Sequence, residues 1–273
     1  MSSLCDAHLH LQDPRIPNPI EALRQAKDAG VQWMVVNGVQ PDDWNAVLEL
    51  AQSDPVIVPS IGLHPWHVAK TEDSWAKRLE AIVENHPVGI GEVGLDRWMP
   101  HPDTAQQEAV LRFSIELAIH HRRPLSIHCL RAWGALRALL EDYAPIEPGF
   151  LLHAYSGSKE MIAPFSEMGA YFSFSGYFGH ERKTKRREAF EWVPRDRLLI
   201  ETDAPDMLPP ENWIERRFPE APEHHHPANI SAVYQLASTV LKIPLGALTA
   251  QVEENFQRLF GPILSPTVSE KGT

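Results

Sequence analysis

The chain has 273 residues, of which 43% are hydrophobic and 22% are charged, and its formal net charge is −11. These values describe an ordinary globular protein with ample material for a core, and the acidic balance argues against a general nucleic-acid coat protein, which would be basic. No apolar run is long enough to span a bilayer and no basic, apolar leader precedes His8, so we expect neither a membrane span nor a signal segment.

Short β-rich runs alternate along the chain with longer amphipathic stretches. The predicted strands are Leu4–His8, Gln32–Val36, Ile57–Ile61, Val88–Gly91, Pro124–His128, Gly149–His153, Ala170–Ser175 and Arg197–Glu201. The predicted helices are Pro19–Ala29, Asp42–Ser53, Glu72–Glu84, Thr104–His121, Trp133–Asp142, Lys159–Met168, Lys185–Glu191, Asn229–Leu241 and Leu245–Phe260. Eight strands that each precede a helix predict an α/β fold, a single (β/α)8 barrel of the TIM type. We expect this domain to span residues 1–264 and to be followed by a flexible tail over residues 265–273.

One long irregular segment, residues 204–227, contains six prolines. Loops of this length inside a compact domain are usually functional or mobile. Because the segment follows the eighth predicted strand, it should overhang the carboxyl end of the barrel, where the sites of this fold are built.

Six potential metal ligands fall at the predicted ends of five strands. They are His8 and His10 on the first strand, Glu92 on the fourth, His128 on the fifth, His153 on the sixth and Asp203 on the eighth. Residues two apart on a strand point the same way, with Cα atoms about 6.6 Å apart, so both histidines of the first strand can reach inward. A lone strand-end histidine is more often structural and a His-x-His pair is a weak motif. Six such residues at one barrel mouth nevertheless predict a two-metal site.

Glu92 and Asp203 are the candidate catalytic residues. Glu92 lies in the sequence VGIGEVGLD, whose glycines allow close backbone approach around a carboxylate, and it is the natural bridge between two cations. Asp203 could ligate one metal and also orient or deprotonate the attacking water. Glu201 lies two residues earlier and deeper in the barrel, so we interpret it as a supporting or structural group.

Seven stretches carry a resemblance to a known family. In chain order they are DAHLHL (6–11), IGLHPW (61–66), VGIGEVGLD (88–96), RPLSIHC (123–129), LLHAYSGS (151–158), LLIETDAP (198–205) and ENFQRLF (254–260). As a set they resemble the TatD-type metal-dependent deoxyribonucleases of the amidohydrolase superfamily. The resemblance implies a TIM-type barrel and phosphodiester hydrolysis. It also implies one metal near His8, His10, Glu92 and Asp203, and another near Glu92, His128 and His153.

The chain departs from the family pattern in two places. After GLD the family usually has an aromatic residue, whereas this chain has Arg97 and then Trp98. After the eighth strand the family usually has an Asn-Glu-Pro element, whereas this chain reads EHHHPAN at residues 223–229. The second change bears on substrate specificity, because that loop should border the site.

A basic segment follows the seventh predicted strand, where five of the six residues from 182 to 187 are lysine or arginine. The candidate substrate-binding residues in it are Arg182, Lys183, Arg186 and Arg187. On the same mouth as the metals they would contact the phosphate backbone of DNA. A solvated start of the seventh helix accounts for the segment equally well.

Other residues near the mouth are weaker candidates. His64 could bind substrate, because it follows the third predicted strand within IGLHPW. Trp66, Trp98 and Trp213 could stack on a splayed single strand, although each alone more often serves packing. The run His224–His226 could be a third metal site, but we favour a flexible polar loop.

The sequence therefore predicts a divalent-metal hydrolase that cleaves DNA phosphodiester bonds with a metal-activated water, an exonuclease by resemblance. We expect single-stranded or frayed DNA ends as substrate and no obligate protein partner. The alternatives are a small-molecule amidohydrolase or esterase with the same two-metal site, since a fold does not fix its substrate, and a binding protein with a vestigial site. Histidine ligation favours zinc, whereas phosphodiester hydrolysis often uses magnesium or manganese. Two cysteines, Cys5 and Cys129, predict a reducing cytoplasm and no catalytic thiol.

Overall fold

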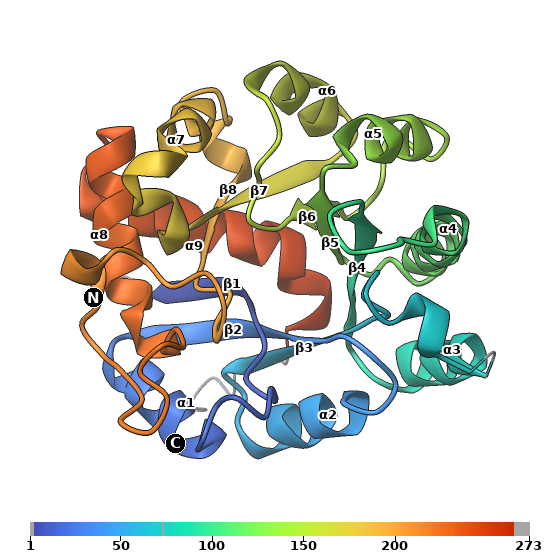
Figure 1. Cartoon of the computed structure of the whole chain (residues 1–273), viewed down its shortest axis with the longest axis horizontal. Helices are drawn as coiled ribbons and strands as arrows, with labels where there is room; N and C mark the ends of the chain where they lie inside the picture. Colours follow the sequence, from blue (N-terminus) through green and yellow to red (C-terminus); the bar gives the residue numbers. More distant parts are fainter. Residues whose placement is uncertain (1–2, 73, 265–273) are drawn as a thin grey trace, which may run out of the picture.

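Eight parallel strands form one sheet whose spatial order follows the chain, as the computed structural model shows (Figure 1). The structure describes residues 3–72 and 74–264. The strands are β1 (Leu4–Leu9), β2 (Val31–Gly38), β3 (Ile57–Ile61), β4 (Gly89–Asp96), β5 (Leu125–Leu130), β6 (Phe150–Leu152), β7 (Ala170–Ser175) and β8 (Leu198–Glu201). Both faces of such a sheet are covered, so the strands are apolar almost throughout, and every residue of β4 and β7 is buried.

The first and last strands meet and leave the barrel nearly closed. The backbone N–H of Asp203 donates to the carbonyl oxygen of His8 at 2.9 Å, and that of His10 donates to Ala204 at 2.7 Å. Deeper in the barrel the carboxylate of Asp6 accepts hydrogen bonds from the backbone N–H of Thr202 at 2.9 Å and from its hydroxyl at 2.5 Å. A buried side chain therefore completes the junction between β1 and β8.

Helices α1 to α8 form a ring around the strands in Figure 1. They are α1 (Pro19–Asp28), α2 (Trp44–Ser53), α3 (Trp75–Asn85), α4 (Thr104–His121), α5 (Trp133–Glu141), α6 (Ile162–Glu167), α7 (Thr184–Phe190) and α8 (Ile230–Leu241). Local sequence starts several of them. Asn18 caps α1 by accepting from the N–H of Glu21, and Asp103 caps α4 in the same way.

The last helix, α9 (Leu245–Phe260), closes the amino end of the barrel. The amide of Asn255 donates to the carbonyl of Leu198, where β8 begins, and Phe256 stacks on Trp33 near the start of β2. The carboxyl end of the barrel is thus left for a site. No helix in residues 3–72 or 74–264 is long and apolar enough to cross a membrane.

The predicted barrel is confirmed, with local differences. The fourth strand continues to Asp96 instead of ending at Gly91, because Val93 and Leu95 still pair with β5 after a register shift. Glu92 therefore lies within the strand. The helix predicted over 159–168 is a short 3-10 turn followed by α6. The predicted tail over 265–273 lies outside the described residues.

Candidate metal centre

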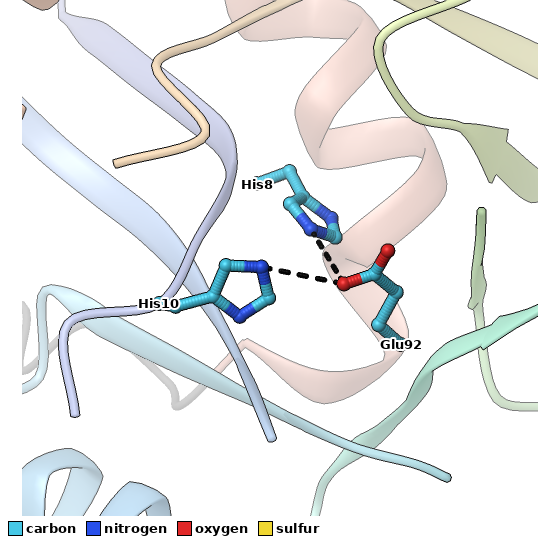
Figure 2. Close-up of side chains that lie close together, drawn as sticks. All are labelled: His8, His10 and Glu92. Carbon is cyan, nitrogen blue, oxygen red and sulfur yellow. Dashed lines mark ion pairs between the residues drawn. The ribbon is translucent and has the colours of Figure 1, made fainter. Parts of the chain in front are cut away.

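The carboxylate of Glu92 lies at the centre of a group of histidines at the carboxyl end of the barrel. One oxygen, Oε2, is 3.4 Å from Nε2 of His8 and 3.3 Å from Nε2 of His10, as Figure 2 shows. All three side chains are buried, and the two histidines approach from β1 while Glu92 approaches from β4. The paired histidines of the first strand do point inward together.

The other oxygen of Glu92 faces a second set of imidazoles. Its Oε1 is 2.9 Å from Nε2 of His153, 3.1 Å from Nδ1 of His128 and 3.3 Å from Nε2 of His64. Each oxygen thus has its own ring nitrogens around it. A carboxylate in this position can bridge two cations, one at each oxygen.

Asp203 completes the first set from the opposite side. Its Oδ1 lies 3.8 Å from Nε2 of His8 and 3.6 Å from Nε2 of His10. The residue adopts a left-handed backbone conformation, with φ of 56°, directly after β8. The hydrogen bond from its N–H to the His8 carbonyl helps to hold this unusual conformation. Residues in such sparsely populated backbone conformations are often found at functional sites.

The donor atoms form three overlapping groups with metal-ligand chemistry. The groups are His8, His10 and Glu92; His8, His153 and Asp203; and His64, Glu92 and His128, with the donor atoms of each group within 4.8 Å of one another. Among the described residues, Nε2 of His8 is buried and has no hydrogen-bond partner, as is also true of Nε2 of His225, but only Nε2 of His8 lies within 4 Å of carboxylates. A buried ring nitrogen without a partner is costly in a protein interior, so a cation at this position fits the residues present.

The outer nitrogens of the histidines are held by neighbouring strands. Nδ1 of His8 bonds Oγ of Ser126 on β5 at 2.9 Å. Nδ1 of His10 faces the carbonyl oxygen of Asn37 on β2 at 2.8 Å, which can only accept, so Nδ1 carries a hydrogen and Nε2 is the nitrogen that a cation would occupy in place of a proton. Such outer partners orient metal-binding imidazoles and raise their basicity.

The net charge of the cluster favours a cation. Burial opposes protonation of His10, but Glu92 and Asp203 outweigh it and raise the pKa of His10 to about 9. Burial would raise the pKa of Glu92, yet the surrounding imidazoles, foremost those of His64 and His153, hold it well below its usual range. Burial raises the pKa of Asp203 to about 7. At His10 the carboxylates therefore attract positive charge even though desolvation opposes it.

Asp96 is a supporting residue that the sequence reasoning missed. Its Oδ2 is 3.2 Å from Nε2 of His128, and burial of this carboxyl is outweighed by that contact and by Trp66, so its pKa falls to about 2. The signal was available, because Asp96 lies four residues after Glu92 on one strand and so shares its face. Ser126, two residues before His128, could have been found in the same way.

Gly94, between Glu92 and Asp96, keeps β4 and β5 close. Its φ is +150°, and a Cβ built there would lie 1.9 Å from the carbonyl oxygen of His128. No side chain fits in that space, so a larger residue would push His128 away from the cluster.

Glu201 lies behind His153, as expected for a supporting group. Its Oε1 is 3.7 Å from Nδ1 of His153, and its other oxygen accepts a hydrogen bond from Ser173.

Arg15 links the loops that follow His10 and Asp203. Its guanidinium pairs with Asp13 at 2.8 Å and with Asp206 at 2.6 Å.

The basic segment follows the carboxyl end of β7 and is fixed in different ways along its length. Arg182 donates to the hydroxyl of Tyr177 at 2.8 Å, and the ammonium of Lys183 lies 4.7 Å from the centre of the same ring. Arg186 reaches the carbonyl of Gly157 at 3.4 Å. Arg187 is different, because it donates to the carbonyls of two residues in the preceding turn at 2.7 and 2.8 Å.

The preferred interpretation of His224–His226 as a flexible polar loop is wrong for His225 and His226. His225 and His226 are buried, at 0% and 2% exposure. Nδ1 of His225 bonds the carbonyl of Thr202 at 2.9 Å, and Nδ1 of His226 accepts from the N–H of Ala228. These contacts make the two histidines part of the packing under the turn that carries Asp203.

The chain was compared with known families and structures. Residues 5–261 match the family model for TatD related DNase. An uncharacterized metal-dependent hydrolase, YjjV of Escherichia coli, is 30% identical over 206 residues, covering 74% of this chain and 79% of that protein. A 3'-5' ssDNA/RNA exonuclease TatD of Erwinia tasmaniensis is 28% identical over 243 residues, covering 88% and 92%. The crystal structure of the E. coli TatD homolog YjjV superposes with a TM-score of 0.86 at 26% identity, covering 94% and 98%.

Proposed function

The chain belongs to the family of TatD-related DNases, and we propose that this metal-dependent hydrolase is an exonuclease acting on single-stranded or frayed ends of DNA. The observation that carries the proposal is the position of Glu92, whose two oxygens face separate sets of imidazoles. The family relatives include proteins named as 3'-5' ssDNA/RNA exonucleases, which supports a nucleic-acid substrate for this chain.

We assign the metal ligands as follows. His8, His10, Glu92 and Asp203 would hold one divalent ion, and Glu92, His128 and His153 would hold the other, in keeping with the contacts of each set. Magnesium, manganese or zinc, when bound, would neutralise the phosphate oxygens and lower the pKa of a water. A bridging glutamate is what two adjacent cations require to offset their repulsion.

Asp203 is the proposed proton acceptor. The carboxylate faces His8 and His10 on one side and stays 8% exposed at the mouth. It can therefore orient a water and take a proton from it. Glu92 keeps its negative charge and would position the metal ions.

We propose that His64 binds substrate and not a metal, although its Nε2 lies close to the carboxylate of Glu92. Burial lowers the pKa of His64 to about 4, so the ring is neutral. Its Nδ1 accepts the N–H of Trp66 at 3.2 Å, which places the ring hydrogen on Nε2. A nitrogen that carries hydrogen cannot ligate a metal, but it can donate to a phosphate oxygen.

Three residues of the basic segment, Arg182, Lys183 and Arg186, are proposed to contact the phosphate backbone farther from the cleavage point. Arg187 was predicted with them, but its guanidinium donates hydrogen bonds to two carbonyls of the preceding turn. It would therefore hold the conformation of the segment instead of binding phosphate. We also propose a cytoplasmic location, since Cys5 and Cys129 are buried free thiols.

The test is to strip the protein of metal and add back magnesium, manganese or zinc. Each form is assayed on end-labelled single- and double-stranded DNA, on RNA and on a panel of N-acyl amino acids. We expect stepwise shortening of single-stranded DNA with at least one metal. Cleavage of the amides without any cleavage of nucleic acid would overturn the proposal in favour of the amidohydrolase alternative.

A further inference from the structure

Three tryptophans are strongly exposed among the described residues: Trp66 at 49%, Trp98 at 56% and Trp192 at 61%. Trp66 follows β3 and Trp98 follows β4, so both lie at the carboxyl end of neighbouring strands. Trp192 lies between α7 and β8, on the side where β8 begins, which is the opposite end of the barrel. Exposed indoles at the mouth need an explanation that packing does not supply.

Trp66 is half exposed and yet firmly held. Its indole N–H donates to Oδ2 of Asp96 at 2.7 Å, and its backbone N–H donates to Nδ1 of His64. The Trp66 and His64 rings meet edge to face with centroids 5.4 Å apart. A ring fixed on one side and open on the other loses little conformational entropy when a flat ligand packs on it.

The residues that hold Trp66 also belong to the metal centre. His64 reaches Oε1 of Glu92 at 3.3 Å, and Oδ2 of Asp96 contacts Nε2 of His128 at 3.2 Å. The indole therefore stands one side chain away from Glu92. A nucleobase next to the cleaved phosphodiester could therefore reach the Trp66 ring.

Trp98 is fixed through the same carboxylate. Oδ1 of Asp96 accepts the backbone N–H of Trp98 at 2.6 Å and that of Met99 at 3.2 Å. One buried carboxylate thus sets the position of the Trp66 ring, of the segment that carries Trp98 and of His128.

We propose that Trp66 and Trp98 form a base-stacking surface for the nucleobase beside the cleaved phosphodiester of a single-stranded nucleic acid. This inference rests on the proposed nuclease function and adds what the enzyme recognises. Base–aromatic stacking tolerates any base, because every base has a π-face. A base held in a duplex cannot offer that face, so the surface selects unpaired ends.

The test compares two single-stranded oligothymidines with the metal-loaded enzyme. One carries normal bases, and the other has abasic residues at three positions from each end, which leaves the sugar-phosphate backbone intact. Loss of one stacked base should raise KM about tenfold, and kcat should change little because a base contact made equally in ground and transition states acts on binding. The wild type should therefore prefer the normal oligonucleotide, and Trp66→Ala or Trp98→Ala should lose that preference.

Two further variants separate stacking from structural effects. Trp66→Phe keeps an aromatic ring without the N–H donor to Asp96, so it should retain most of the preference for bases. Trp192→Ala removes an equally exposed indole at the other end of the barrel and should behave as the wild type.

The failures are distinguishable. If the wild type cleaves both oligonucleotides with the same KM, the stacking surface is refuted while the nuclease function stands. If Trp66→Ala keeps the full preference, the surface is likewise refuted. Cleavage of neither oligonucleotide by the wild type would overturn both proposals.

Discussion

Two regions of this molecule are rich in buried histidine, and they use it in opposite ways. At the mouth, His8 and His10 face the carboxylates of Glu92 and Asp203. Behind the turn after β8, His225 and His226 face backbone groups.

The difference lies in the surrounding charge. Carboxylates overcome the effect of burial and raise the pKa of His10 to about 9, whereas burial lowers the pKa of His225 to about 4 because its hydrogen bonds to the backbone do not offset it. A histidine surrounded by negative charge has a place for a cation. His225 has its Nδ1 on a carbonyl, as His10 does, but no carboxylate of the described residues forms an ion pair with it, so we interpret it as a packing element.

The largest effect is expected when the negative charge of Glu92 is removed, because both sets of histidines at the mouth face it. Glu92→Gln keeps the shape of the side chain but loses the charge that both histidine sets face. Outer-shell changes cost about 10–100-fold in metal affinity or activity, so turnover should fall by more than about a hundredfold. Metal content by mass spectrometry and oligonucleotide cleavage measure the effect. His225→Gln is the control, and a Glu92→Gln enzyme with full metal content and activity would refute the assignment.

Weakening the support of one histidine should have a smaller effect. Asp96→Asn removes the negative charge beside Nε2 of His128, and metal affinity should fall by about 10–100-fold. Competition with a chelator of known affinity gives the value. Asp142→Asn, which removes a surface partner of Arg112, is the matched control. Equal affinities in the two variants would mean that Asp96 does not support the centre.

The buried histidines of the loop should affect acid stability and not metal binding. His225 titrates near its ordinary 6.5 when unfolded and at about 4 when folded. Between these values the unfolded chain binds more protons, so stability is lost as the pH falls from 6.5 to 4, by at most about 3 kcal/mol. Urea unfolding of the chelated protein should show a shallower pH slope in His225→Gln, with metal content retained by the loaded form. An identical slope would contradict the shift.

The smallest expected effect concerns the basic segment. Arg186→Gln should raise KM for long oligonucleotides severalfold at low salt, and the dependence of KM on salt should weaken by about one counterion. The loss should disappear at high salt, unlike the loss from Trp66→Ala, because stacking is not screened. Arg112→Gln, on the surface of α4, serves as control. An effect that is independent of salt would argue against a phosphate contact.

Sequence reasoning found the barrel and brought together His8, His10, Glu92, His128, His153 and Asp203, because strand ends and ligand types are local signals. It did not find Asp96, since the fourth strand was predicted to end at Gly91, and only pairing with β5 shows that β4 continues.

The histidines of the loop show a second limit. A run such as EHHHPAN reads as polar and solvated, and its burial depends on partners far away in the chain. Thr202 lies 23 residues before His225. Which nitrogen of His64 carries hydrogen is likewise set by a neighbouring backbone N–H, which residue spacing cannot reveal.

The junction between β1 and β8 has a consequence for synthesis of the protein. Asp6 and Thr202, which bond across it, are 196 residues apart, so the histidines of β1 leave the ribosome long before Asp203 exists. No shorter nascent chain can assemble the cluster. The hydrolase therefore becomes active only after translation has passed the eighth strand, because a chain cut short before that point carries most of the ligands but lacks Asp203.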